Sequence, residues 1–123
     1  MILIDTSILI GYFKGTKGEP YNRLDGFIEQ NIPLGICNQV YQEVLQGSKD
    51  EKEFVLLNEY LNTLDFYDLR YGKKSYENAA WMYYKCRKAG ITPRSTIDLI
   101  IAQTAIDNNL LNDYPYIYLN SFL

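Results

Sequence analysis

The sequence contains no histidine, one tryptophan and two cysteines among its 123 residues. Without histidine the chain has no imidazole for metal binding, and any mechanism built on a pair of histidines is excluded. A metal site would have to rely on carboxylates, which favour a hard cation such as Mg²⁺ or Mn²⁺. Cys37 and Cys86 lack CxxC spacing. We therefore expect them to be buried reduced thiols rather than a disulfide or a zinc site.

The chain also lacks long apolar runs. Hydrophobic residues make up 47% of the sequence, but no segment approaches the ~20 apolar residues of a membrane-spanning helix. The apolar N-terminal segment has no basic region before it and is interrupted by Asp5, unlike a secretory signal. We expect one soluble domain over residues 1–123, located in the cytoplasm and without a membrane partner.

The basic residues are unevenly distributed, although the net charge is only −3. More than half of them lie between Arg70 and Arg94, a stretch in which Glu77 is the only acid. Two interpretations stay open, a surface that contacts nucleic-acid phosphates and the ordinary solvated face of a helix. Tyr83 and Tyr84 lie in the same stretch, and we interpret them as core residues rather than as partners for base stacking.

Short apolar segments alternate with amphipathic segments along the chain. The pattern predicts strands near 1–4, 34–37 and 65–69, and helices near 6–15, 21–30, 38–47, 50–64, 73–88 and 96–108. We expect Asn38 to be the N-cap of the helix that it precedes. Strands alternating with helices predict βαβ units, and therefore an α/β fold with a largely parallel sheet covered by helices on both faces.

Three acids lie among apolar neighbours, where an unpartnered charge would be costly to bury. Asp5 ends the first strand, Glu43 lies in the helix near 38–47, and Asp98 lies in the first turn of the last predicted helix. Converging carboxylates repel one another unless a cation lies between them, so we expect a divalent metal site. Each acid also has a structural explanation, as a helix cap, a helix-surface residue or a first-turn residue respectively.

Three segments together carry a resemblance to a known family: LIDTSILI, the N-x-x-x-x-E helix and GITPRSTIDLIIAQTAI. They resemble PIN-domain ribonucleases, in particular the toxin subunit of VapBC toxin–antitoxin pairs. The resemblance implies a three-layer α/β/α sandwich, hydrolysis of single-stranded RNA, a homodimer, and a small antitoxin whose C-terminal segment blocks the active site. It also implies Mg²⁺ or Mn²⁺ held by Asp5, Glu43 and Asp98, with Thr6 or Ser7 as supporting polar ligands.

The C-terminal segment NNLLNDYPYIYLNSFL departs from the family's pattern, because the strand before the acid is shortened to 110–111. Asp113 aligns either with a fourth metal-site acid or with the later Asp of an Asp-Phe stretch. We favour the second alignment, with a strand at 116–119. The alternative function is therefore a weakened or inactive PIN-like module that binds an antitoxin or RNA without cleaving it. A haloacid-dehalogenase-like phosphatase fits poorly, because its Asp-x-Asp motif would need an acid where Ser7 stands.

Overall fold

The computed structural model describes residues 2–93 and 95–112 of the chain. The helices and strands are, in chain order, β1 (Ile2–Leu3), α1 (Thr6–Phe13), α2 (Glu19–Glu29), β2 (Leu34–Cys37), α3 (Asn38–Gln46), α4 (Glu51–Leu61), β3 (Asp65–Tyr67), α5 (Lys73–Lys88), α6 (Thr96–Asp107) and β4 (Leu111–Asn112). The alternation confirms the predicted α/β class. The predicted strand at 116–119 lies outside the described residues.

The four described strands form one sheet in the order β3-β2-β1-β4, and every neighbouring pair is parallel. Ile2 in β1 lies opposite Leu34 in β2 and Leu111 in β4. Because all these strands run in one direction, their carboxyl ends meet along a single edge of the sheet. In open α/β sheets that edge is where ligands bind.

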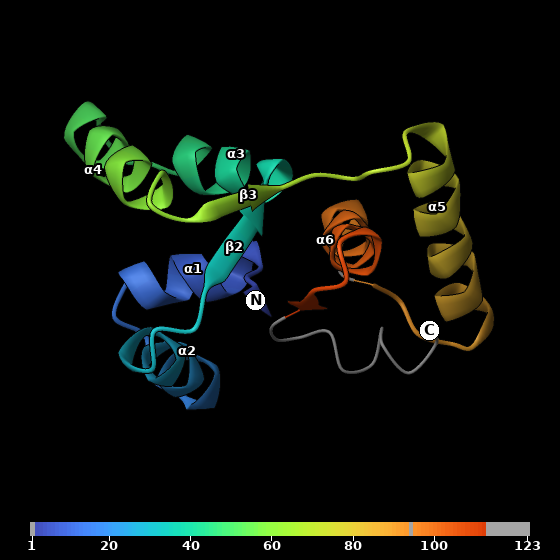
Figure 1. Ribbon diagram of the computed structural model, residues 1–123, viewed down its shortest axis with the longest axis horizontal. Coiled ribbons are helices and arrows are strands. Elements are labelled where there is room, and N and C mark those ends of the chain that lie inside the picture. Colours follow the sequence, from blue (N-terminus) through green and yellow to red (C-terminus); the bar gives the residue numbers. More distant parts are fainter. Residues whose placement is uncertain (1, 94, 113–123) are drawn as a thin grey trace.

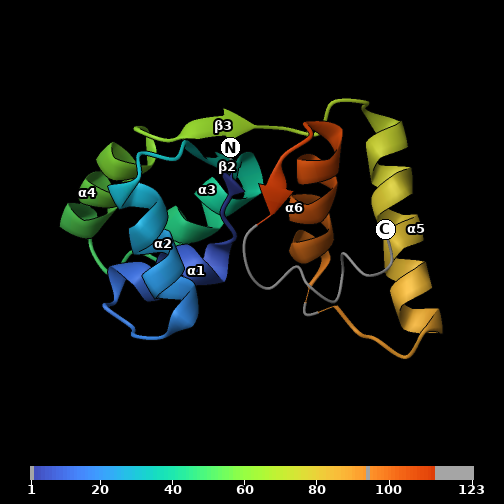
Figure 2. The ribbon, with the colours of Figure 1, turned by 60° about the horizontal axis from the view of Figure 1, so that its bottom comes forward.

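The helices form layers on both sides of the sheet (Figures 1 and 2). Helices α1 to α4 lie on one side, and α6 lies on the other. Helix α5 packs on the side of α6 that faces away from the sheet, so it is the outermost element at that end of the molecule. The three-layer sandwich expected from the resemblance is therefore confirmed, with α5 added outside it.

The main hydrophobic core lies around the sheet. The strands contribute continuous apolar runs, as expected when both faces of a parallel sheet are covered. Its buried members are Leu3, Ile4, Ile8, Leu9, Leu24, Ile36, Cys37, Val40, Val44, Leu45, Leu61, Ile101 and Ala105. This core fixes the orientation of the strands and of α1 and α3, and therefore the geometry at the carboxyl edge.

A second, smaller core lies between α5 and α6. Its buried members are Ala79, Met82, Cys86, Leu99, Ile100 and Ala102. Helix α6 contributes to both cores, which explains why it is apolar on nearly every side. Helix α5 contributes to the second core alone and leaves its other faces in solvent.

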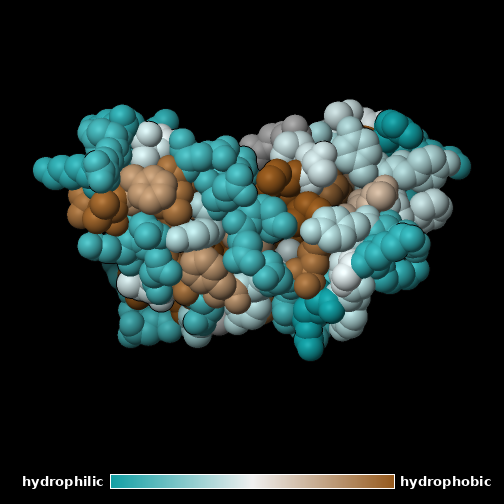
Figure 3. Space-filling view, turned by 90° about the horizontal axis from the view of Figure 1, so that it is seen from above, coloured by the Kyte–Doolittle hydropathy of each residue, from teal (hydrophilic) through white to brown (hydrophobic). Residues whose placement is uncertain are grey.

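Local details differ from the sequence predictions at two helices. Asn38 is the first residue of α3 rather than its N-cap, and its side chain instead donates a hydrogen bond to Asp68. The amphipathic segment predicted as a helix near 50–64 forms α4, but its apolar residues are only partly buried, because Phe54 is 43% exposed while Leu61 is fully buried. Figure 3 shows the apolar surface that results over α4, at the left of that view.

Both cysteines are free and buried, as predicted. Burial raises the pKa of the Cys37 thiol and of the Cys86 thiol, so both stay protonated at neutral pH. Within the described part of the chain, no helix has the length and apolar character needed to cross a membrane.

Candidate active site

Polar residues follow the strands at the carboxyl edge of the sheet. Asp5 comes just after β1, Asn38 directly after β2 and Asp68 directly after β3. The amide of Asn38 donates to the carboxylate of Asp68 at 2.6 Å, which ties the ends of β2 and β3 together. The edge therefore carries two acids, one after β1 and one after β3 with β2 between them, of which Asp5 is the buried one.

Asp5 has a fixed carboxylate at the start of α1. Its Oδ1 accepts hydrogen bonds from the backbone N–H of Ile8 at 3.0 Å and from the hydroxyl of Ser7 at 2.9 Å. Its side chain is the N-cap of α1, and the residue is only 3% exposed. The capping interpretation is thus confirmed, and capping also holds the carboxylate in one orientation at the end of β1.

Glu43 is brought to the same end of α1 by the fold. The hydroxyl of Thr6 donates to Oε1 of Glu43 at 2.9 Å, across 37 positions of sequence. Glu43 lies on α3 beside the buried Val40 and Val44, which hold that helix against the main core. The start of α1 therefore carries two hydrogen-bonded pairs, Asp5–Ser7 and Thr6–Glu43.

The third predicted acid, Asp98, lies in the first turn of α6 and is partly buried. Its backbone N–H donates to the Ser95 hydroxyl at 3.4 Å, so Ser95 caps this helix. In residues 2–93 and 95–112, no three Asp, Glu, His or Cys side chains are grouped closely enough to hold a metal ion. Metal binding by Asp5, Glu43 and Asp98 stays a prediction, and Asp113 lies outside the described residues.

The donor atoms near Asp5 suit a hard cation. The carboxylates of Asp5 and Glu43 and the hydroxyls of Thr6 and Ser7 all offer oxygen, the ligand that Mg²⁺ and Mn²⁺ prefer. The neighbouring Cys37 is fully buried and its raised pKa keeps it a thiol, so it does not supply a soft thiolate ligand. The chemistry of this donor set fits Mg²⁺ or Mn²⁺.

Asp107, at the end of α6, is a buried acid that the sequence interpretation missed. Its carboxylate accepts hydrogen bonds from the Ser75 hydroxyl at 2.6 Å, the Gln103 amide at 2.9 Å and the backbone N–H of Arg70 at 3.0 Å. Burial alone would raise the pKa of Asp107, but these hydrogen bonds together lower it below its usual value. The charged carboxylate therefore holds α5, α6 and the loop after β3 together.

One signal in the sequence could have identified Asp107. An acid in the last turn of a helix is disfavoured by the partial negative charge at that end. Asp107 occupies that position at the end of a helix that is otherwise largely apolar and buried, so its presence implies a compensating partner. The partners come from α5 and the preceding loop, which no local pattern identifies.

Comparison with known proteins decides the family. The family model described as "PIN domain" matches residues 2–111. The chain belongs to the PIN-domain family. Three curated relatives are each 31% identical to this PIN domain over 107 residues, which is 86% of its length and 79% of theirs: VapC ribonuclease Mb1587 of Mycobacterium bovis and ribonuclease VapC11 of two Mycobacterium tuberculosis strains. These relatives confirm the VapC-type family recognised from the sequence.

Solved structures share the fold of this PIN domain at low identity. VapBC2 from Rickettsia felis, bound to a DNA fragment from their promoter, matches with a TM-score of 0.70 and 21% identity over 96% of this chain and 92% of that one. A toxin–antitoxin complex from Klebsiella pneumoniae matches with a TM-score of 0.68 and 20% identity over 91% of this chain and 83% of that one. At such identities the match establishes the fold alone.

Proposed function

We propose that this PIN domain is a Mg²⁺- or Mn²⁺-dependent endonuclease that cleaves single-stranded RNA. The observation that carries the proposal is the buried carboxylate of Asp5, held at the carboxyl edge of the sheet beside the Thr6–Glu43 hydrogen bond. A buried acid in a fixed orientation at that edge is suited to binding a ligand cation. The ribonuclease names of the curated relatives support the same reaction.

Asp5, Glu43 and Asp98 would hold the cation, with Thr6 and Ser7 as supporting polar groups. When bound, a divalent ion lowers the pKa of a coordinated water and stabilises negative charge on the phosphodiester. The carboxylates of the chain would orient that water in line with the scissile bond. One of them would accept its proton, because the chain contains no histidine to do so.

The residues around Asp5 already provide part of the required order. Its two described hydrogen bonds come from Ser7 and from the backbone of α1, so the carboxylate does not need to reorient before it binds a ligand. The Thr6 hydroxyl fixes Glu43 in the same way. Preorganised groups of this kind lower the reorganisation that a reaction would otherwise require.

We also propose that the protein acts as the toxin of a toxin–antitoxin pair in the cytoplasm. The solved structures of related fold include a toxin–antitoxin complex from Klebsiella pneumoniae and VapBC2 from Rickettsia felis bound to a DNA fragment from their promoter. A small antitoxin would then bind this PIN domain and block its active site, and the PIN domain would form a homodimer. Co-expression with the product of the neighbouring reading frame, followed by co-purification, tests the antitoxin directly.

The competing function is a PIN-like module that binds RNA or an antitoxin without cleaving. The shortened segment before Asp113 is the observation that favours it, because a fourth metal-site acid is then displaced. Titrating Mg²⁺ or Mn²⁺ into the protein separates the alternatives. An inactive module would show no cleavage at any metal concentration, and a large loss of metal affinity on Asp113→Asn would show that Asp113 is the fourth acid.

The decisive experiment measures cleavage of single-stranded RNA by purified protein with Mg²⁺ or Mn²⁺, and again with excess EDTA. Asp5→Asn should lower the rate at least about 100-fold, because it removes one negative ligand while keeping a side chain that can accept hydrogen bonds. Asp98→Asn should do the same. Asp65→Asn is the matched control, because this exposed acid begins β3 at the opposite edge of the sheet. Full cleavage in EDTA, or by the Asp5 variant, would overturn the proposal.

A further inference from the structure

Charge divides this molecule into two regions of opposite sign. Helix α5 carries five basic residues and one acid, Glu77, whereas the rest of the chain carries seven basic and fourteen acidic residues. The acid on α5 forms an ion pair with Lys74 of the same helix. The outermost helix is therefore a region of net positive charge on a protein whose overall net charge is −3, and it lies far along the chain from Asp5.

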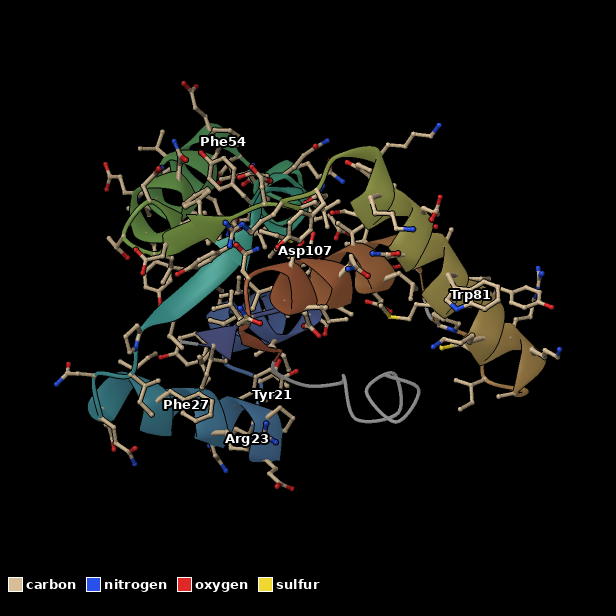
Figure 4. All side chains as sticks on the ribbon, turned by 45° about the vertical axis from the view of Figure 1, so that its right-hand side comes forward. Tyr21, Arg23, Phe27, Phe54, Trp81 and Asp107 are labelled. Carbon is tan, nitrogen blue, oxygen red and sulfur yellow. The ribbon has the colours of Figure 1, made fainter. Side chains whose placement is uncertain are left out.

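The same helix carries an exposed pair of stacked aromatic rings. The rings of Trp81 and Tyr84 lie 5.2 Å apart between centroids, at an interplanar angle of 20°. Trp81 is 59% exposed and Tyr84 is 41% exposed, so the interpretation of Tyr84 as a core residue is wrong. Figure 4 shows Trp81 on the side of α5 that points away from α6. The ammonium group of Lys88 lies 5.9 Å from the centroid of the Tyr84 ring, one helical turn further along.

A surface groove runs along this aromatic pair. Its volume is about 570 Å³. The residues that line it are Lys74, Glu77, Asn78, Ala80, Trp81 and Tyr84. The small side chain of Ala80 leaves room beside the large Trp81 ring, and the amide of Asn78 offers a hydrogen-bond donor and an acceptor. A flat ring with polar edges suits such a groove.

We propose that the outer face of α5 is a second binding site for single-stranded RNA, separate from the cleavage site. A base would stack on the Trp81–Tyr84 pair, and Lys88 with the neighbouring Arg87 would contact the phosphates. Aromatic platforms with adjacent basic residues bind single strands with little sequence preference, because every base has a stacking face. The choice of RNA as the polymer rests on the proposed function.

Charge favours RNA over a second copy of this chain on the α5 face. Two copies meeting through α5 would bring two positively charged helices together, and such like-charge contacts are unfavourable. An RNA backbone instead supplies one negative charge for each nucleotide. The exposed apolar residues of α4, Phe54, Val55 and Leu56, carry no comparable group of basic neighbours and make a useful contrast.

Trp81 is the only tryptophan of the chain, so its fluorescence reports directly on this site. A short oligouridine is titrated into wild-type protein in EDTA, where metal-dependent cleavage is absent. Stacking on Trp81 should quench the fluorescence in a saturable way, with the same midpoint as fluorescence anisotropy of labelled oligouridine. Binding by anisotropy without any change in Trp81 fluorescence would overturn the proposal.

Variants separate stacking from charge. Trp81→Ala should weaken binding about tenfold, and Trp81→Phe should restore most of the affinity because it keeps an aromatic face. Replacing Lys88 by Gln should lessen the dependence of log K on log salt by about 0.7, as expected for one lost phosphate contact to a single strand. Phe54→Ala is the control, since it removes an exposed aromatic from α4 and should leave binding unchanged.

The outcomes distinguish this proposal from the proposed nuclease. Asp5→Asn should lose cleavage and still quench Trp81, whereas Trp81→Ala should bind weakly and still cleave at saturating RNA. If Trp81→Ala binds and cleaves like wild type, the α5 site is wrong and the nuclease proposal is unaffected. If Trp81→Ala instead converts a wild-type dimer into monomers in sedimentation experiments, without loss of oligouridine affinity, the α5 face is a subunit interface and this proposal fails.

Discussion

The carboxyl edge of the sheet and the outer face of α5 differ in burial, charge and support. At the edge, Asp5 is buried next to the main core, and it accepts hydrogen bonds from Ser7 and from the backbone of Ile8 in α1. On α5, Trp81 and Tyr84 are exposed among basic residues and rest on the second core alone. The difference suits the two proposed tasks, RNA cleavage at the edge and RNA binding on α5. Catalysis needs fixed and desolvated groups, whereas binding of a polyanion needs accessible ones.

The two regions are joined by one buried carboxylate, that of Asp107. Its partners are Ser75 in α5, Gln103 in α6 and the backbone of Arg70 in the loop after β3. The hydroxyl of Ser75 also accepts a hydrogen bond from the backbone N–H of Tyr71, which extends the network along that loop. The position of α5 relative to the sheet therefore depends on Asp107 as well as on the second core.

Among the changes that test how the two regions are connected, Asp107→Ala should have the largest effect on stability. The change leaves three buried or partly buried donors without their acceptor, and we expect the free energy of unfolding to fall by about 3 kcal/mol. Urea denaturation at neutral pH measures the loss. Hydrogen exchange should rise in α5 more than in α3, because α5 depends on the second core and on this network.

Two further variants test whether the loss of stability in Asp107→Ala comes from the lost hydrogen bonds. Asp107→Asn keeps one acceptor oxygen and should lose less stability than the alanine variant. Asp65→Ala, at an exposed acid, should change stability by less than about 0.5 kcal/mol. An Asp107→Ala variant as stable as the Asp65 control would show that Asp107 does not hold α5 in place.

Much of the fold follows from local patterns in the sequence. β2 and α5 occupy the residues predicted for them, because an apolar run bounded by Pro33 and a long helix closed before Gly90 are strong local signals. The role of Asn38 was mispredicted because its hydrogen-bond partner is distant in the sequence. Its side chain bonds to Asp68, 30 positions away, and that partner outcompetes local capping.

The candidate site shows the same division between local and distant information. Asp5 could be identified because an acid that ends an apolar strand is unusual in the local sequence. The Thr6–Glu43 hydrogen bond could not be derived, because it spans 37 positions. The stacked Trp81 and Tyr84 were hidden for a topological reason. Their exposure follows from α5 being the outermost layer, which no periodicity within the helix reveals.

Lowering the pH should reduce the stability contributed by the Asp107 carboxylate, which connects α5 to the loop after β3. We expect this loss to be smaller than the loss caused by Asp107→Ala. The folded-state pKa of Asp107 is lowered, so its carboxylate contributes stability above its unfolded-state pKa of about 4 and loses that contribution as pH falls through the folded-state value. Denaturation at about pH 7, 5 and 3 should show wild type losing more stability than Asp107→Asn. Equal losses in the two proteins would assign the acid sensitivity to other carboxylates.

The smallest effect on stability is expected at the carboxyl edge, from Thr6→Val. This change keeps the shape of the side chain but removes the hydroxyl that donates to Glu43, which costs about 1 kcal/mol. Thr92→Val, at an exposed loop position, is the control and should cost less than that. Because Glu43 loses its fixed orientation, the rate of RNA cleavage should fall by a larger factor than the folding equilibrium constant does. Oligouridine binding at Trp81 should stay unchanged. Loss of binding together with cleavage would show that the two regions are one site, and equal cleavage by both valine variants would show that Glu43 needs no positioning by Thr6.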